Sequence, residues 1–167
     1  MTSPMLVVCD TSPLSNLAII GRLELLREQF VMVRMPPRVA RELTALRHPA
    51  GQSALADAIQ EGWLIEMPLP ESAPYPDALH GLDAGETDAL RLAIAISADA
   101  VLIDEKEGRK RAAGLGLRTV GVIGVLIVAK QNGRIQSLAA EIGRLRREAG
   151  FFVDGKLEAK ALAMAGE

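Results

Sequence analysis

Short apolar segments alternate along the chain with longer segments in which apolar residues recur at helical spacing. The short segments have the length and composition of buried strands, and the longer ones predict amphipathic helices. Strands are predicted at Met5–Cys9, Val31–Val33, Trp63–Ile65, Ala100–Ile103 and Arg118–Val120. Helices are predicted from Leu14 to Leu25, after Pro36–Pro37 through Leu46, and over 52–60, 83–97, 107–113, 123–131, 135–149 and beyond Gly155.

This alternation predicts parallel strands joined by right-handed helical crossovers, with helices on both faces of the sheet. The expected fold is therefore a three-layer α/β/α sandwich around a mostly parallel sheet. The 167 residues suit one main domain, over 1–150, followed by a charged helical tail over 151–167. Four prolines between Pro68 and Pro76 mark an exposed connector.

Composition and charge exclude several classes of function. The formal net charge of −2 provides no global attraction for nucleic acid, so binding of a polyanion would need a local basic patch or metal ions. The single cysteine, Cys9, excludes an internal disulfide and fits its apolar strand as a small hydrophobe. No apolar run approaches about 18 residues and the first residues lack a leader pattern, so we expect a cytoplasmic protein without a membrane span.

Acidic residues follow two of the predicted strands directly. Asp10 comes after the first strand, and Asp104 and Glu105 come after the strand at Ala100–Ile103. Open parallel sheets build their binding sites at the carboxyl ends of strands, so these carboxylates are expected to meet there. Glu42 and Glu86, on predicted helices, bring the number of converging acidic positions to four.

Clustered carboxylates repel one another unless a cation or a proton neutralises them. Oxygen ligands without histidine or thiolate select Mg²⁺ or Mn²⁺, and such ions usually also bind phosphate oxygens. The two histidines, His48 and His80, lie far apart in the sequence, which argues against a zinc site. The sequence therefore predicts a magnesium-type site for phosphoester chemistry.

Each acid also has a purely structural interpretation. Asp10 could cap the following helix, and Glu42 lies among three arginines with which it could form surface ion pairs. Glu86 could complete a capping box with Asp83, a role that competes with metal binding. Both interpretations stay open at the level of sequence.

A basic run follows the fourth acid, at Lys106, Arg109, Lys110 and Arg111. Helical spacing places residues 106, 109 and 110 on one face. This face either is simply solvated or binds phosphate groups beside the metal, which would supply the local attraction that the net charge lacks. Aromatic residues make up 3% of the chain, too few for a base-stacking platform.

Four segments resemble PIN-domain proteins: VVCDTSPLSNLAIIGRLELL, LDAGETDALRLA, VLIDEKEGRKRAAGLGL and VIGVLIVAKQNGRI. The resemblance covers residues 5–150 and is strongest to a VapC-like branch that opens Asp-Thr-Ser-Pro-Leu. It implies a PIN-like fold and an Mg²⁺- or Mn²⁺-dependent endoribonuclease acting on RNA. Many PIN proteins are toxins paired with an antitoxin, so the resemblance also implies an antitoxin partner. The apolar helices over 84–97 and 123–128 further predict a homodimer.

The resemblance assigns roles to individual positions. It implies that the four catalytic acids are Asp10, Glu42, Glu86 and Asp104. Asp10, Glu86 and Asp104 are the implied metal ligands, with Glu105 as the alternative fourth acid and Asp88 as the alternative to Glu86. Supporting or phosphate-binding roles fall to Ser12, Asn16, Lys106 and Arg109.

Two other functions compete with this prediction. A haloacid-dehalogenase-type phosphatase also begins with a strand and an aspartate, but it needs a second aspartate two residues later, where this chain has Ser12. A nuclease-inactive PIN-like module would keep the acids as capping groups while it binds a partner or RNA. Binding of Mg²⁺ distinguishes this module from the enzyme.

Overall fold

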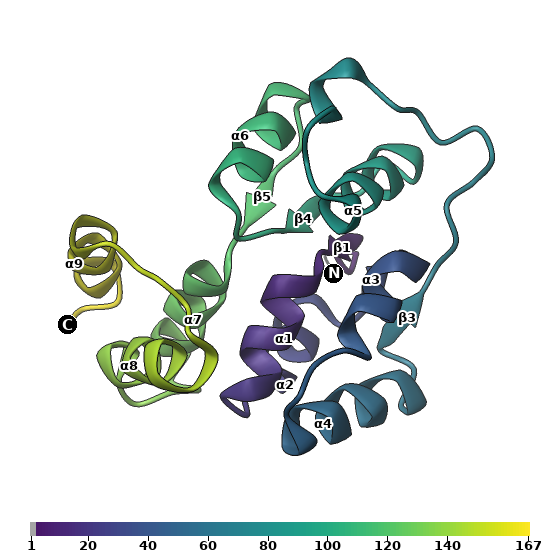
Figure 1. Ribbon diagram of the computed structural model, residues 1–167. Helices are drawn as coiled ribbons and strands as arrows, with labels where there is room; N and C mark the ends of the chain where they lie inside the picture. Colours follow the sequence, from purple (N-terminus) through teal and green to yellow (C-terminus); the bar gives the residue numbers. More distant parts are fainter. Residues whose placement is uncertain (1–2) are drawn as a thin grey trace.

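The computed structural model describes residues 3–167, so Met1 and Thr2 of the predicted main domain lie outside the described residues. Across residues 3–167, five parallel strands form one sheet in the order β3-β2-β1-β4-β5. The strands are β1 (Val7–Cys9), β2 (Val33–Met35), β3 (Leu64–Glu66), β4 (Ala100–Leu102) and β5 (Thr119–Val120). The predicted α/β/α sandwich is confirmed (Figure 1).

Helices occupy the connections between the strands and the region after β5. The first half of the chain holds α1 (Thr11–Ile19), α2 (Glu24–Phe30), α3 (Pro37–Leu43) and α4 (Pro49–Gln60). A short 3-10 helix, η1 (Asp77–Leu79), ends the proline-rich connector. The second half holds α5 (Ala84–Ala95), α6 (Lys106–Gly114), α7 (Val122–Gln131), α8 (Leu138–Ala149) and α9 (Gly155–Met164). No helix within residues 3–167 is long and apolar enough to cross a bilayer.

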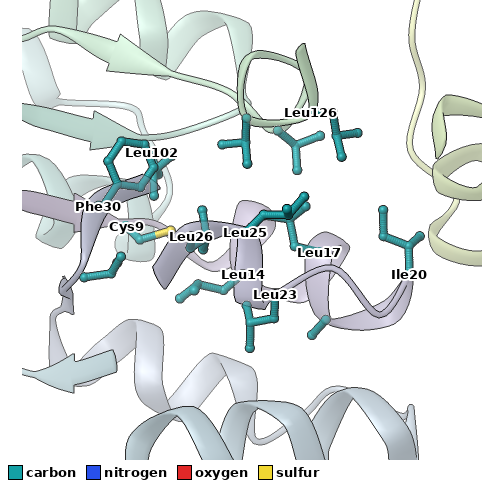
Figure 2. Packing of buried hydrophobic residues seen from close by; sticks show 14 of the residues in the cluster. Cys9, Leu14, Leu17, Ile20, Leu23, Leu25, Leu26, Phe30, Leu102 and Leu126 are labelled. Carbon is teal, nitrogen blue, oxygen red and sulfur yellow. The ribbon is translucent and has the colours of Figure 1, made fainter. Parts of the chain in front are cut away.

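The hydrophobic core has one part on each face of the sheet, because alternate strand side chains point to opposite faces. Val7 and Cys9 point into the larger part, together with leucines of α1 and α2. Leu126 of α7 closes this part, and Figure 2 shows its side chain facing those leucines. Cys9 is fully buried there, which confirms its role as a small hydrophobe and raises the pKa of its thiol.

The smaller part of the core lies under α5 and α6. Val8 and Val101 of the sheet pack there against Leu90 of α5 and Ala112 of α6. The C-terminal helix α9 belongs to the larger part, since it packs on α7 and buries Ala161. Figure 1 shows α7, α8 and α9 grouped on one side of the molecule.

Several predicted boundaries were wrong for local reasons. The strand predicted at Val31–Val33 begins at Val33, because Val31 occupies a tight turn with a φ of 67° in which the Met32 N–H donates to the Phe30 carbonyl at 2.7 Å. The helix predicted from Leu14 to Leu25 is two helices, separated at Gly21, whose φ of 68° a helix cannot contain. The helix predicted through Leu46 ends at Leu43. That predicted through Ser97 ends at Ala95, and Ser97 also has a positive φ.

Candidate functional site

Asp10 and Asp104 lie at the carboxyl ends of two neighbouring strands. Asp10 follows β1, and its backbone N–H donates to the carbonyl of Leu102, the last residue of β4, at 2.9 Å. Asp104 lies two residues beyond Leu102. The strand order reverses between β1 and β4, so both carboxylates lie at the point where open α/β sheets bind ligands.

Asp10 occupies the N-cap position of α1, but its side chain makes no capping hydrogen bond. The interpretation of Asp10 as an ordinary helix cap is therefore wrong. Only 5% of the residue is exposed, and burial raises the pKa of Asp10 to about 7. The adjacent Thr11 N–H lowers this pKa, whereas the charges of Asp83, Glu86 and Glu42 raise it.

Glu86 is positioned by the first turn of α5. Its backbone N–H donates to Asp83 Oδ1 at 2.8 Å, and its Oε2 accepts from the Asp83 N–H at 3.3 Å, which completes a capping box. Glu86 is nevertheless 4% exposed, and burial followed by repulsion from Asp83 raises the pKa of its carboxyl to about 7. Glu105 raises this pKa as well. The capping box thus holds Glu86 among acids instead of turning it to solvent.

Glu42 reaches the same region from α3. Its Oε2 accepts a short hydrogen bond from the Thr11 hydroxyl at the start of α1. A Cβ atom at Gly85 would lie 2.6 Å from the same oxygen, so a larger residue there would force the Glu42 carboxylate to move from its place beside α5. The surface ion pairs considered for Glu42 are not formed within residues 3–167.

Asp104 is held by a backbone N–H at the start of α7, just after β5. The Val122 N–H at the start of α7 donates to Asp104 Oδ1 at 2.7 Å. Burial raises the pKa of Asp104 to about 6, against the lowering effects of the Val122 N–H, Arg109 and Asn16. Asp104 Oδ2 is buried and has no hydrogen-bond partner among residues 3–167. One oxygen of this carboxylate is thus left for a ligand.

A second close approach occurs where α6 passes Glu86. A Cβ atom at Gly108 would lie 3.0 Å from Glu86 Oε1 and even closer to Ile103. Glycine therefore lets α6 pack directly against the carboxylate. We use the name acid cluster for Asp10, Glu42, Asp83, Glu86 and Asp104, which the fold places at one edge of the sheet.

The acid cluster offers only carboxylate oxygens, the ligands that Mg²⁺ and Mn²⁺ prefer. Two of its members, Asp10 and Glu86, are buried and Asp104 is half-buried. All three have a raised pKa, which is the electrostatic state expected where a cation would neutralise the charges. Within the described part of the chain, no three acidic, histidine or cysteine side chains are already gathered at metal-binding distance. A cation would therefore have to draw the carboxylates together.

Two of the predicted supporting residues lie beside Asp104, and two others are exposed. Asn16 is buried, and its side chain lowers the pKa of Asp104. The positive charge of Arg109 lies beside the same carboxylate and lowers this pKa as well. Lys106 is exposed at the start of α6. Ser12 is exposed, and its carbonyl accepts from Ser15.

Asp88 belongs to a different environment from the acid cluster. Its carboxylate pairs with Arg38 at 3.5 Å and with Arg91 at 4.0 Å. It contributes to no raised pKa among the cluster members. Its position therefore favours Glu86 over Asp88 as the third acid.

Comparison with known families agrees with this geometry. The family model DUF3368, described as a PIN domain, matches residues 6–167. The chain belongs to the PIN-domain family. PIN domains are generally nucleases and usually use divalent metals. None of the curated proteins compared with the chain is significantly similar to it.

This PIN domain has two site residues that the sequence did not reveal. The sequence marks Asp83 only as a helix cap, yet its charge raises the pKa of both Asp10 and Glu86. The sequence gives Thr11 no role, although its hydroxyl donates to Glu42. The signal for Asp83 was its spacing of three residues from Glu86, which already implied contact between the two. No sequence signal linked Thr11 to Glu42, because they are 31 residues apart.

Proposed function

We propose that this PIN domain is an Mg²⁺- or Mn²⁺-dependent endoribonuclease that hydrolyses RNA phosphodiester bonds at the acid cluster. The observation that carries the proposal is the position of Asp10, Glu86 and Asp104 at one strand edge, where the first two are buried and the third is half-buried with one buried oxygen that has no hydrogen-bond partner among residues 3–167. The pKa of each of these three acids is raised. Among the causes of these raised pKa values, the only nearby cation is Arg109, beside Asp104. Such a cluster is costly for the fold unless it serves to bind a cation.

The residues fit a hard divalent cation by their chemistry. Asp10, Glu86 and Asp104 would hold it, and the Asp104 oxygen without a hydrogen-bond partner supports this role. When bound, the cation would lower the pKa of a water molecule and neutralise charge on phosphate oxygens. Glu42 is kept at the same edge by Thr11 and Gly85, where it could orient that water.

Basic side chains next to the acid cluster suit a phosphate-bearing substrate. Arg109 lies beside Asp104, and Lys106 stands exposed one helical turn earlier on α6. Their charges would attract an RNA backbone locally, although the formal net charge of the chain is −2. The resemblance to VapC-like proteins supports a toxin role with an antitoxin protein as partner, which growth arrest on induced expression, abolished by Asp104→Asn, would test.

The inactive binding module is a second candidate, favoured by one observation. The carboxylates within residues 3–167 are not gathered at metal-binding distance, and Glu86 Oε2 is engaged in its capping box. In that case the acids would serve only the local structure. The two candidates differ in whether Mn²⁺ binds and whether RNA is cleaved.

Cleavage of a labelled RNA with Mn²⁺, with Mg²⁺ and with EDTA tests the proposal. We expect Asp10→Asn and Asp104→Asn each to lower cleavage by at least about 100-fold, since each removes a charge at the reacting centre. Asp88→Asn is the matched control. Asp88 lies on α5 two residues after Glu86 but pairs with Arg38 and Arg91, so its substitution should leave cleavage unchanged. Equal activity of all three variants, or wild-type cleavage in EDTA, would refute the proposal.

A further inference from the structure

A long groove extends from the acid cluster to the C-terminal helix. It has a volume of about 1470 Å³ and runs from Asp104 and the start of α6, past β5, and across α7 to α9. Figure 1 shows that α7 follows directly after β5, and α9 packs on α7. The metal and RNA chemistry proposed above uses only the end of this groove at Asp104.

Part of the lining of the groove consists of exposed apolar side chains. Phe152 is 84% exposed, Met164 55%, Leu157 47% and Val128 38%, and all four line the groove. Ile127 lies beside them on α7. Large apolar side chains gathered at one place on a surface mark an interaction site, whereas isolated ones do not.

The charged side chains of the groove are mostly basic. Lys106, Arg118 and Lys160 line it and have no carboxylate partner among residues 3–167, whereas Arg134 is neutralised by Glu28. The one acid of the α9 side, Asp154, is engaged in capping that helix. The groove therefore complements an occupant that carries both apolar and acidic groups.

We propose that the groove binds an acidic, amphipathic helix of a partner protein. An amphipathic helix places apolar anchors along one face, which suits the side chains of α7 and α9, and its flanking carboxylates would meet the three basic side chains. The apolar side chains of the lining favour a protein segment over a nucleic acid, which would leave those side chains uncovered.

A second copy of the chain is a poorer occupant. The carboxylates that this chain carries beside its own C-terminal helices are already paired, as Glu148 with Arg144, Glu158 with Arg146 and Glu167 with Lys130. These carboxylates would have to break their own ion pairs to contact the basic side chains in the groove of another copy. An acidic helix from a different protein meets this requirement.

Occupation of the groove would also cover Asp104 at its end. This consequence rests on the proposed function, whereas the docking itself does not. Binding is therefore measured in EDTA without RNA, so failure of the nuclease proposal leaves the docking proposal intact, and the reverse also holds.

The probe is a fluorescein-labelled helical peptide of about 14 residues with leucines at i, i+3, i+4 and i+7 and glutamates on both flanks. A second peptide keeps the leucines and replaces every glutamate by lysine. Fluorescence anisotropy should show saturable binding of the acidic peptide and at least about tenfold weaker binding of the basic one. Absence of saturable binding up to about 1 mM, or equal binding of both peptides, overturns the proposal.

Variants with matched controls locate the binding. Lys160→Glu and Leu157→Ser should each raise the Kd at least about tenfold. Lys156→Glu, on the same helix but outside the groove, and Ile59→Ser, an exposed apolar residue of α4, should leave the Kd unchanged. These four residues are exposed, and circular dichroism confirms that each variant is folded. Equal Kd values for groove and control variants would overturn the proposal.

Two further measurements decide between occupants. If an oligoadenylate of about 12 nucleotides binds more weakly to Lys160→Glu but equally to Leu157→Ser, the groove is a nucleic-acid surface and the proposal fails. If the wild type sediments as a dimer and Leu157→Ser as a monomer, the occupant is a second copy and the proposal fails. A wild type and a Leu157→Ser variant of equal mass, with oligoadenylate binding that is absent or is unchanged by both Lys160→Glu and Leu157→Ser, support it.

Discussion

Two glutamates of this PIN domain are equally buried but have opposite surroundings. Glu141 on α8 is 5% exposed and accepts two hydrogen bonds from Arg22, at 2.6 and 3.1 Å. Glu86 on α5 is 4% exposed, and the charged groups that shift its pKa are Asp83 and Glu105. Because the two side chains are equally buried, the difference between their surroundings lies in charge. The fold places an arginine beside Glu141 and further acids beside Glu86.

The same contrast extends to the regions around the two glutamates. Near the C-terminal helices, the pKa values of Glu28 and Glu158 are lowered by hydrogen bonds from Arg134 and Arg146. At the acid cluster, burial raises the pKa values of Asp10 and Asp104. Acids of the first kind have a cation from the chain itself, whereas those of the second kind would be stabilised by the cation that we propose to bind there.

Neutralising each glutamate should separate the two roles. Glu86→Gln keeps the capping box, which accepts Gln, and removes a buried charge, so we expect cleavage to fall at least about 100-fold while stability at pH 8 is unchanged or higher. Glu141→Gln leaves Arg22 without its partner and should lower the free energy of unfolding by about 2 kcal/mol. Thermal unfolding and RNA cleavage by the same preparations measure both effects.

The expected loss for Glu141→Gln corresponds to a decrease in Tm of about 4–8 °C for a domain of this size. Its cleavage rate per folded molecule should equal that of the wild type, because Glu141 lies outside the acid cluster. Stability loss in Glu86→Gln, or activity loss in Glu141→Gln, would show that the contrast between the regions is wrong.

The pH dependence of stability should reveal the acid cluster in the metal-free protein. The pKa values of Asp10 and Glu86 are raised to about 7 and that of Asp104 to about 6, so between about pH 4 and pH 7 the folded state binds more protons than the unfolded state. The free energy of unfolding must then decrease as pH rises, on the order of 5 kcal/mol from pH 5.5 to pH 8 for the three acids together. Thermal unfolding in EDTA at both pH values measures this.

Added Mn²⁺ should restore Tm at pH 8 more than at pH 5.5, because protons compete with the cation for the carboxylates. Asp10→Asn is the control that should flatten the pH dependence. The lowered pKa values of Glu28, Glu158 and Glu167 change stability only at lower pH, so they do not obscure this window. A Tm that increases from pH 5.5 to pH 8 in EDTA would contradict the burial of uncompensated acids.

Sequence patterns could predict the sheet and the strand-edge acids because both depend on local order. Asp10 and Asp104 directly follow apolar strands, and parallel strands place their carboxyl ends at one edge. The spacing of Asp83 and Glu86 likewise predicted a capping box, which the structure contains. Local patterns also misplaced β2 by two residues, since nothing in the apolar run shows that Val31 forms a tight turn.

Contacts between distant segments could not be predicted in the same way. Glu86 and Glu141 are both glutamates on amphipathic helices, and only the fold places Arg22, 119 residues away, beside the second. The proximity of Gly108 to Glu86 depends on how closely α5 and α6 pack. The sequence could thus name the acids, but their electrostatic state depends on tertiary contacts.

Thr11 is a neutral residue whose hydroxyl holds Glu42, a member of the acid cluster, in place. The effect of replacing Thr11 should be smaller than that of removing an acid. Its hydroxyl donates to Glu42, which has no arginine partner within residues 3–167. Thr11→Val keeps the shape and removes the hydrogen bond, so we expect kcat to fall about tenfold with little change in KM. Thr11→Ser should restore kcat because it keeps the hydroxyl, and Tm should be similar in both variants. If Thr11→Ser is as impaired as Thr11→Val, packing of the methyl group matters and the hydroxyl does not position Glu42.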